Sequence, residues 1–560
     1  MSTKSNKKQE VITEKKSIDN VTAKPFNFRH PFIYLSAIVI LLYIGSLNFG
    51  FTELDDTIFV NDYKAYNSEL SNIAHSFHRG VFDETKDTYY RPLLMVSFIV
   101  NNWISDTNSK GYHAINLLFH LLSVFLLFIF FKKMEMQKNM AFLLTALFAV
   151  HPVLSQAVAW IPGRNDTLMA VFILAYMIAS IEFLQKEKYT FLFLQGLFFL
   201  CALYTKETSL FVPPAFLFLL STTTFFNWKN KRSIIMYGMW SVAAIVWFIA
   251  RAGATIKNDP IQFASMAKSF VVRFPLAIQY LGKIILPFNL SVFPMMADTS
   301  YIFGFAAIAV LVALLYFSTE RKMKIVFAGL AWFIFLLIPL FVLPSVLNDQ
   351  DFEHRLYLPI IGILFILSQT ILFKDEKKSI LIVSIIAVCF AGINYFHQQK
   401  FADTLTFWTD AVRTTPNSSY ANMMLGARTK EDMQKATAYM HKAFELNPKE
   451  KYVNYYLGKY YLDNNDINKA EKYLTAELKG SAYYDTYFCM SRLSFLKKDT
   501  TKCISYMETY LEKDGANGPA INNYILMLAQ TNQKEKARQF IAKKRSENIP
   551  ISQELSDLVK

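Results

Sequence analysis

Cysteine is scarce in this sequence, with four residues among 560. Four scattered cysteines exclude a small scaffold built on disulfides. Cys201 and Cys389 stand inside apolar runs, whereas Cys489 and Cys503 lie in the polar C-terminal part. For this second pair the sequence leaves open either a disulfide in an oxidising compartment or two buried thiols, and it favours the thiols.

Groups of metal-ligating residues are lacking as well. No set of His and Cys residues has the spacing of a zinc site. The adjacent carboxylates of Asp55 and Asp56 would by themselves make a poor cation cage. We therefore expect neither a metal nor any other cofactor.

Acidic residues are outnumbered by basic ones, 44 against 58, which gives a net charge of +14. A basic balance can indicate a nucleic-acid partner. Here, however, the Lys and Arg residues fall in the N-terminal tail and in short loops between apolar runs, which is how membrane proteins fix their orientation. The sequence therefore predicts a membrane partner and no nucleic acid.

Apolar residues are abundant: they make up 53% of the chain, with 51 Phe and 30 Tyr. Soluble domains of ordinary composition hold roughly 45–50%. Most of the excess falls in runs long enough to cross a bilayer as helices. The eleven predicted spans are 31–50, 111–131, 140–158, 166–184, 190–205, 208–227, 233–250, 301–318, 324–343, 357–373 and 379–397.

Charge placement predicts the topology of these spans. With the N-terminus in the cytosol, all the basic loops fall on the cytoplasmic side. The segment 270–287 contains Arg273 and Lys283 and breaks this rule if it is counted as a span, so we expect a helix at the outer surface there. The chain then divides into a disordered cytoplasmic tail (1–29), a membrane domain (30–397) and an extracytoplasmic domain (398–560).

The C-terminal domain is repetitive. The small residues Ala436, Ala470, Cys503 and Ala537 follow one another at intervals of 34, 33 and 34. A 34-residue period with a small residue in the second helix resembles the tetratricopeptide repeat. Stacked repeats of this kind build a concave surface that binds polypeptides, so we expect acceptor proteins to bind there. The alternative is that the array only caps or dimerises the membrane domain.

The stretch "FTELDDTIFVNDY" places Asp55 and Asp56 just after the first span, on the outer side. Acids at such a boundary can simply be solvated loop residues. Two together also suit general-base work, in which a carboxylate takes the proton of an acceptor hydroxyl as it attacks a sugar. Because like charges repel in a low-dielectric site, one of the two should have a cation neighbour or a raised pKa.

Further ionisable and polar residues gather on the same predicted outer face. Each alone could be a simple ion pair, but together they suggest a site that handles a phosphate and a sugar beside the lipid. The candidate substrate-binding residues are Tyr90, Arg91, His151, Arg164, Asp166, Lys206, Glu207, His354, Arg355 and Tyr357.

The ordered set of motifs resembles a known family. The acidic pair is followed by "YYRPL", "GYHAINLLFHLLS", "HPVLSQAVAWIPGRND", "YTKETS", "LPFNLSVFP", "EHRLYLP" and the repeats. This series is similar to the transmembrane and tetratricopeptide repeat-containing O-mannosyltransferases and their bacterial relatives in the GT-C superfamily. The chain departs from them at Leu154 and Gln156, where the family often has His and Glu.

The resemblance implies an all-α, GT-C-type membrane domain with its active site on the extracytoplasmic face. It implies a lipid-linked donor, a polyprenyl-phosphate sugar such as mannose, and Ser or Thr of a protein as acceptor. The acidic pair would carry the base, and of the two we lean to Asp56. Composition suggests a bacterial chain, hence an inner-membrane location with periplasmic repeats.

Two other functions remain open at this stage. The same fold could glycosylate a lipid or a glycan, although the repeats argue against this because such acceptors need no polypeptide-binding surface. The chain could also be a non-catalytic membrane scaffold, although a scaffold needs neither paired acids nor a set of cations. A transporter should place its ionisable residues near mid-membrane, not at the ends of spans.

Overall fold

The computed structural model describes residues 28–82, 89–255, 262–342, 350–429, 431–480 and 483–560. The predicted disordered tail, apart from its last two residues, lies outside the described residues. Within the described ranges the chain is helical, and its only β-structure is an isolated bridge between Met295 and Gln350. The all-α class is thus confirmed.

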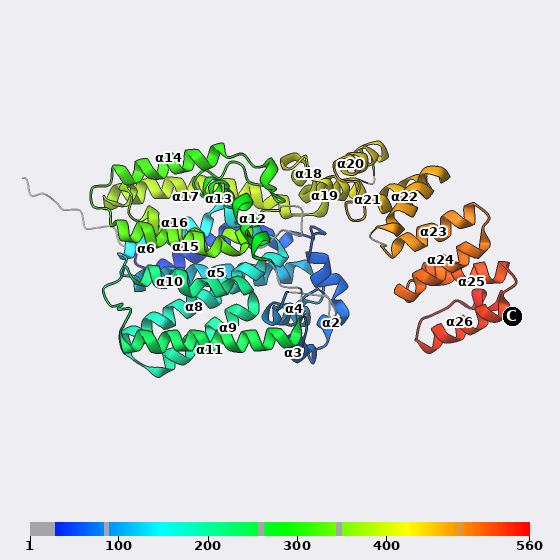
Figure 1. Cartoon of the computed structure of the whole chain (residues 1–560), viewed down its shortest axis with the longest axis horizontal. Helices are drawn as coiled ribbons and strands as arrows, with labels where there is room; N and C mark the ends of the chain where they lie inside the picture. The colour runs from blue at the N-terminus through cyan, green and yellow to red at the C-terminus, as the bar shows by residue number, and fades with distance from the viewer. Residues whose placement is uncertain (1–27, 83–88, 256–261, 343–349, 430, 481–482) are drawn as a thin grey trace, which may run out of the picture.

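The N-terminal two-thirds of the chain form a bundle of apolar helices (Figure 1). A helix of 24 residues is roughly 36 Å long, enough to cross the hydrocarbon core of a bilayer. Six helices of the described chain are long and apolar enough to do so, which defines a multi-pass membrane protein. They are Pro31–Asn48 (containing α1, Pro31–Tyr43), α5 (Ser109–Lys133), Ile161–Lys186 (containing α8, Arg164–Lys186), α11 (Lys231–Ala254), α15 (Met323–Val342) and Glu376–Phe401 (containing α17, Glu376–Gln398).

Other predicted spans correspond to shorter or bent helices. The expected span 140–158 is a pair bent by 52°, α6 (Lys138–Val150) followed by Pro152–Ala159. Three more correspond to apolar helices below spanning length: α9 (Tyr189–Thr205), Glu207–Leu220 (containing α10, Val212–Leu220) and α14 (Ile302–Tyr316). The expected span 357–373 contains α16 (Ile360–Leu367). The count of eleven therefore stays a prediction.

Two further regions contain helices outside these spans. Sequence reasoning did not anticipate α4 (Pro92–Ser105), an apolar helix that follows directly on Arg91. The segment 270–287, expected not to span, holds the end of α12 (Phe263–Arg273) and α13 (Leu276–Ile285). Both helices are too short to cross a membrane.

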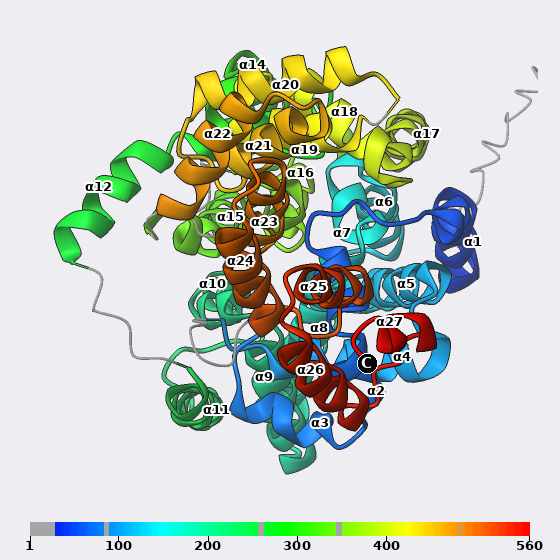
Figure 2. The same ribbon diagram turned by 90° about the vertical axis from the view of Figure 1, so that its right-hand side faces the viewer.

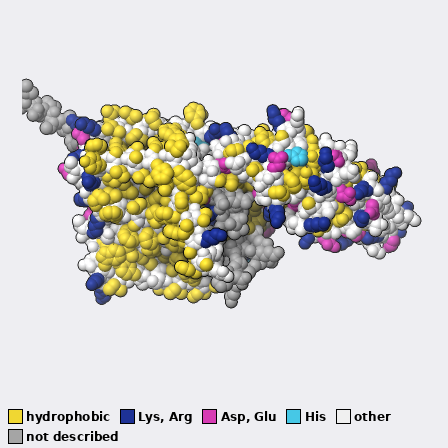
Figure 3. All heavy atoms as spheres, turned by 45° about the horizontal axis from the view of Figure 1, so that its top comes forward, with side chains coloured by type: hydrophobic (Ala, Val, Ile, Leu, Met, Phe, Trp, Pro, Cys, Tyr) yellow, Lys and Arg dark blue, Asp and Glu magenta, His cyan; other side chains and the backbone are white. Residues whose placement is uncertain are grey.

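The surface of the bundle is apolar between charged margins. Figure 3 shows hydrophobic side chains covering its visible face, with Lys and Arg gathered toward the two ends. Large side chains such as Ile249, Val388 and Phe396 are exposed there. A soluble protein rarely exposes so continuous an apolar surface, whereas a lipid-facing surface requires one.

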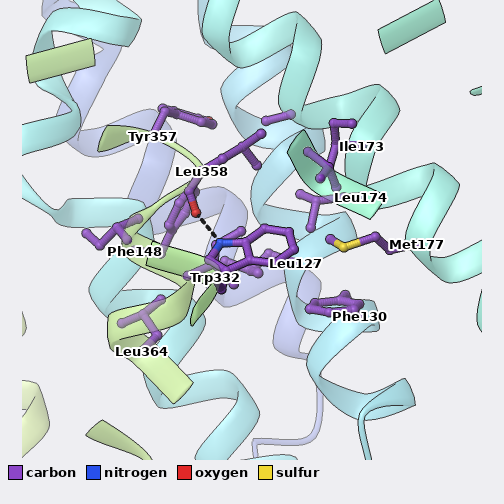
Figure 4. Close-up of a cluster of buried hydrophobic side chains, with 14 of the residues drawn as sticks. Leu127, Phe130, Phe148, Ile173, Leu174, Met177, Trp332, Tyr357, Leu358 and Leu364 are labelled. Atoms are coloured by element: carbon purple, nitrogen blue, oxygen red, sulfur yellow. Dashed lines mark hydrogen bonds between the residues drawn. The ribbon is translucent and has the colours of Figure 1, made fainter. Parts of the chain in front are cut away.

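The core beside the outer end is closely packed (Figure 4). Trp332 of α15 is fully buried, and its indole N–H donates to the Leu358 carbonyl oxygen over 2.8 Å. Around it lie Phe130 of α5 and Met177 of α8. This packing fixes the segment that follows Arg355, and so it positions one wall of the pocket described below.

Beyond α17 the chain forms successive helix pairs that extend away from the bundle (Figure 1). In the end-on view of Figure 2 these pairs cross in front of the membrane helices. Cys489 and Cys503 are buried free thiols, as the sequence favoured. The helices are α18 (Thr404–Thr414), α19 (Ser419–Arg428), α20 (Met433–Leu446), α21 (Val453–Asp463), α22 (Ile467–Lys479), α23 (Asp485–Leu496), α24 (Thr500–Lys513), α25 (Gly518–Gln530), α26 (Lys534–Ser546) and α27 (Gln553–Asp557).

Candidate active site

The two adjacent carboxylates have different surroundings. Asp56 is 1% exposed, and its carboxylate accepts hydrogen bonds from Thr52 N (2.5 Å), Thr52 Oγ1 (3.0 Å) and Thr57 N (3.0 Å). Burial raises the pKa of Asp56 above its ordinary value, and these hydrogen bonds oppose the rise. Asp56 therefore closes the turn that carries its neighbour.

Asp55 is only half-buried. Burial, to which the charge of Asp56 adds, raises the pKa of Asp55 to about 6, while the guanidinium of Arg91 opposes the rise. This is the raised pKa expected for one member of the pair. A carboxylate with this pKa is ionised near neutral pH and still basic enough to accept a proton.

A pocket of about 220 Å³ is lined by Arg91, the residue whose guanidinium acts on Asp55; neither aspartate of the pair lines it. Five of the predicted substrate-binding residues line it: Arg91, Asp166, Lys206, Glu207 and Arg355. They come from the loop before α4, the start of α8, the turn after α9 and the turn before α16. Residues far apart in the sequence are thus brought together at one end of the bundle.

Ion pairs order the charged side of the pocket. Arg91 donates to both carboxylate oxygens of Glu207, from Nε over 2.9 Å and from Nη2 over 2.5 Å. Lys206 Nζ lies 2.8 Å from both oxygens of Asp166. The lysine and Asp166 side chains are 10% and 4% exposed, so this pair is shielded from water. His354 Nε2 lies 4.0 Å from Asp166 Oδ2, which places it next to the pocket.

The pocket also has an apolar lining. It comes from the C-terminal half of α15 and the segment before α16, together with residues of α8 and α10. Its members are Met169, Val212, Leu336, Leu337, Pro339, Leu340, Leu358 and Pro359. A cavity lined by both cations and hydrocarbon suits an amphipathic ligand with an anionic group.

Besides His354, four predicted residues do not line the pocket, and each of these four is buried and bonded within the protein. Tyr90 donates to the Phe77 carbonyl oxygen over 2.9 Å. Tyr357 OH and His120 Nδ1 are 2.7 Å apart. His151 Nε2 lies 2.8 Å from the Ile284 carbonyl oxygen. Arg164 is fully buried and donates to the side-chain oxygens of Asn101 and Asn116 over 2.8 and 3.0 Å.

One cation of the pocket was missed as a site residue. Arg273, at the end of α12, lines the cavity, and its Nη1 donates to the Leu340 carbonyl oxygen over 3.3 Å. The signal was present in the sequence, because Arg273 is an ionisable residue in an apolar segment, and such residues mark functional sites. In the sequence, Arg273 served only to place the segment 270–287 outside the membrane.

A cluster of buried charged residues lies next to the turn that carries His354 and Arg355. Lys283 Nζ lies 2.7 Å from Glu353 Oε1, and the two side chains are 2% and 0% exposed. Glu353 also accepts from Ser291 N over 2.9 Å, and His397 Nε2 lies 3.3 Å from its second oxygen. Because Glu353 directly precedes His354 and Arg355, this cluster fixes the turn that delivers both side chains.

The first C-terminal helices hold the loop that carries the acidic pair. Gly50 N donates to the Ala402 carbonyl oxygen over 2.7 Å. Thr404 Oγ1 donates to Phe51 O over 2.9 Å, and Trp408 Nε1 donates to Thr52 O over 2.9 Å.

The next residue of the loop is held by an ion pair. Glu53 has the left-handed backbone value φ = +56°, and its carboxylate lies 2.8 Å from the guanidinium of Arg428 in α19. Every residue from 50 to 53 is therefore bonded to the segment after α17.

Among the residues that the structure describes, no three His, Cys, Asp or Glu side chains are grouped so as to hold a metal ion. The expectation of metal independence stays a prediction, and chelation tests it.

The fold and the pocket together define a helical, multi-pass membrane protein with an amphipathic pocket at one end. No family model matches the chain. It is 34% identical over 128 residues to protein O-mannosyl-transferase TMTC1 of Mus musculus, and 31% identical over 179 residues to Tmtc1 of Drosophila melanogaster. It is also 30% identical over 153 residues to TMTC3 of Mus musculus.

These matches cover 22%, 31% and 27% of this chain and span 12%, 21% and 16% of the three relatives. The resemblance read from the motifs is thereby confirmed as similarity to the O-mannosyl-transferases TMTC1 and TMTC3. Among solved structures, an oligosaccharyltransferase of Archaeoglobus fulgidus aligns over 73% of this chain and 58% of its own, with 12% identity and a TM-score of 0.36.

Proposed function

We propose that the chain is an integral membrane glycosyltransferase. It transfers a sugar, with mannose as the first candidate, from a polyprenyl-phosphate donor to Ser or Thr hydroxyls of proteins on the extracytoplasmic face. One observation carries the proposal: Arg91, whose guanidinium opposes the rise in pKa of the half-buried Asp55, lines a pocket that combines cations with apolar side chains. The names of the similar proteins support the same reaction class.

The reaction follows from the placement of these groups. The donor phosphate binds at the cations of the pocket, where Arg91, Lys206, Arg273 and Arg355 offset its charge. The polyprenyl chain lies against the apolar lining. Cations held in place before the reaction stabilise the charge that develops on the leaving phosphate at no cost in reorganisation.

Asp55 acts as the general base. The acceptor oxygen attacks the anomeric carbon and forms the new C–O bond, while the bond from that carbon to the phosphate oxygen breaks. The hydroxyl proton passes to Asp55, and polyprenyl phosphate leaves with the bonding electrons. A single displacement of this kind inverts the configuration at the anomeric carbon.

The hydrogen bonds around the pair favour Asp55 as the general base, whereas the sequence favoured Asp56. The oxygens of Asp56 are already engaged by Thr52 and Thr57, so its carboxylate has little capacity left to accept a substrate proton. Asp56 instead orders the turn and, through its charge, raises the pKa of Asp55.

The test is sugar transfer by the purified full chain in detergent. Polyprenyl-phosphate mannose and a panel of related sugars serve as donors, and a periplasmic protein extract serves as acceptor. Asp55→Asn should lower transfer by at least about a hundredfold, as loss of a general base does. Asp56→Asn should lower it less and reduce thermal stability.

The opposite result would identify Asp56 as the general base. If Asp56→Asn abolishes transfer in a folded protein while Asp55→Asn does not, Asp56 is the base. If the wild type transfers no sugar from any donor, the glycosyltransferase proposal is wrong and a scaffold role takes its place. If the wild type transfers sugar and both variants match it, neither aspartate is the base.

A further inference from the structure

A second pocket, of about 440 Å³, lies where the helical bundle meets the first C-terminal helix, α18 (Figure 1). Its lining comes from the loop after α13, the turn before α14, the last turns of α17 and the end of α18. Ser291 Oγ and Thr414 Oγ1, 2.6 Å apart, join the first of these segments to the last. The pocket shares no lining residue with the candidate active site, and its volume is typical of small-ligand sites.

Two cations of the lining share a single acid. Lys400 Nζ lies 2.9 Å and Arg413 Nη2 lies 2.5 Å from the same carboxylate oxygen, Asp410 Oδ1. The Arg413 side chain is still 64% exposed. Because one carboxylate offsets only one of the two positive charges, a phosphate group would find an uncompensated cation here.

Asp298 gives the same pocket a carboxylate. Its Oδ1 accepts from Asn417 Nδ2 over 2.7 Å. Its Oδ2 is buried and has no hydrogen-bond partner among the residues that the structure describes. A buried carboxylate oxygen without a donor is costly, so a ligand that supplies a charged N–H group would be stabilised at this position.

Two further polar side chains of the lining contain buried atoms without a partner in the described chain. They are Nδ2 and Oδ1 of Asn289 and Nδ1 of His397. His397 is 3% exposed, and its other ring nitrogen lies 3.3 Å from Glu353 Oε2. Native proteins leave few buried polar groups unpaired, so their concentration around one cavity indicates a polar ligand.

The pocket also has exposed aromatic side chains. Phe396, in the last turns of α17, is 72% exposed, and Phe288, after α13, is 68% exposed. Phe396 lies near the end of the spanning helix Glu376–Phe401. Large apolar side chains at the end of a span are stabilised by lipid and not by water. The pocket therefore adjoins the level at which lipid headgroups meet acyl chains.

We infer that this pocket binds the headgroup of a phospholipid that carries a primary amine, a lipid of the phosphatidylethanolamine class. Its phosphate lies at Lys400 and Arg413, and its ammonium donates to Asp298 Oδ2. Its acyl chains run along Phe288 and Phe396. The inference does not rest on the proposed function, because the pocket is separate from the candidate active site.

The balance of charge distinguishes this lipid from others. Lys400 and Arg413 are matched by two carboxylates, Asp298 and Asp410, so a headgroup with one charge of each sign keeps the site neutral. Phosphatidylglycerol brings a phosphate but no cation for Asp298. Phosphatidylcholine has both charges, but its quaternary ammonium has no N–H to donate to Asp298 Oδ2.

Lipid binding to the purified full chain in detergent tests the inference. Native mass spectrometry measures Kd for the dioleoyl forms of phosphatidylethanolamine, phosphatidylglycerol and phosphatidylcholine under the same conditions. The wild type should bind phosphatidylethanolamine at least about tenfold more tightly than either of the others, which is the effect of one hydrogen bond between charged groups. Equal binding of the three lipids would overturn the inference, and this comparison needs no variant.

Three variants locate the binding. Asp298→Asn keeps the Oδ1 acceptor for Asn417 and removes the charge, so it should abolish the preference for phosphatidylethanolamine. Arg413→Met should weaken all three lipids about tenfold. The control Arg492→Met removes an exposed cation of α23 that pairs with Asp463, and it should change no affinity. Thermal midpoints show that each variant is folded, and a folded Asp298→Asn protein that keeps the preference would contradict the inference.

A water-soluble headgroup distinguishes a lipid from a free zwitterion. Glycerophosphoethanolamine has the same phosphate and ammonium but no acyl chains. It should bind at least about a hundredfold more weakly than the lipid, because it makes no contact with Phe288 and Phe396. If it binds as tightly as the lipid, the site takes a soluble ligand and the membrane source is wrong.

Discussion

Replacing Lys283 by Met tests whether a buried charge cluster holds the pocket in place. Lys283 and Glu353 are 2.7 Å apart and almost completely shielded from water. Without the lysine, Glu353 keeps only the Ser291 amide and His397 as partners. Leaving a buried carboxylate without its cation costs about 3–5 kcal/mol. Lys283→Met should therefore lower the free energy of unfolding by this amount.

The second step removes the carboxylate as well. Glu353→Gln in the Lys283→Met background leaves no unpaired charge, so the double variant should regain most of the lost stability. The assay is unfolding in detergent, followed by tryptophan fluorescence. The matched control is Lys435→Met, which breaks a solvent-exposed pair with Asp432 and should leave the stability nearly unchanged. If Lys283→Met costs under about 1 kcal/mol, or if the double variant is no more stable than the single one, the reasoning is refuted.

Four further outcomes are expected. Because the base works as a carboxylate and the pKa of Asp55 is about 6, transfer should rise as pH increases through 6 and then level off, with no such rise in Asp55→Asn. Arg428→Ala should lower the stability by less than about 1 kcal/mol, yet it should lower kcat roughly tenfold or more because Glu53 in the loop loses its ion-pair partner. Arg428→Lys should restore part of the rate, and an unchanged kcat in Arg428→Ala would exclude a positioning role. Gly362→Ala should destabilise by about 1–3 kcal/mol, since its Cβ would lie 2.3 Å from Gly329 O, whereas Gly238→Ala, with nothing within 4 Å, should be neutral or stabilising. EDTA should leave transfer unchanged, and loss of activity that a divalent metal restores would contradict the expected metal independence.

The sequence by itself determined the class of the chain, an all-helical, multi-pass membrane protein. Apolar runs of spanning length identify membrane helices without reference to any other part of the chain, because lipid requires a helix to satisfy its own backbone. The 34-residue interval from Ala436 to Ala470 can likewise be recognised without the rest of the chain, because a repeat of this kind contacts only its neighbours. Helix ends were harder to predict, and several expected spans proved short or bent because packing, not hydropathy, decides where a helix breaks.

The candidate site could be read from the sequence only in part. Arg91, Asp166, Lys206, Glu207 and Arg355 were predicted and do line one pocket. Each is an ionisable residue at the end of an apolar run, and that is a signal which sequence alone contains. Such a signal cannot distinguish a residue that faces a cavity from one that is bonded internally, as His151, Arg164 and Tyr357 are.

Tertiary structure gives the two adjacent aspartates different surroundings. In sequence, Asp55 and Asp56 are equivalent neighbours. Folding turns one toward the Thr52 and Thr57 donors and leaves the other half-buried near Arg91. The pKa of a carboxyl depends on the groups around it in space, and one of them here, Arg91, is more than 30 residues from Asp55 in the sequence.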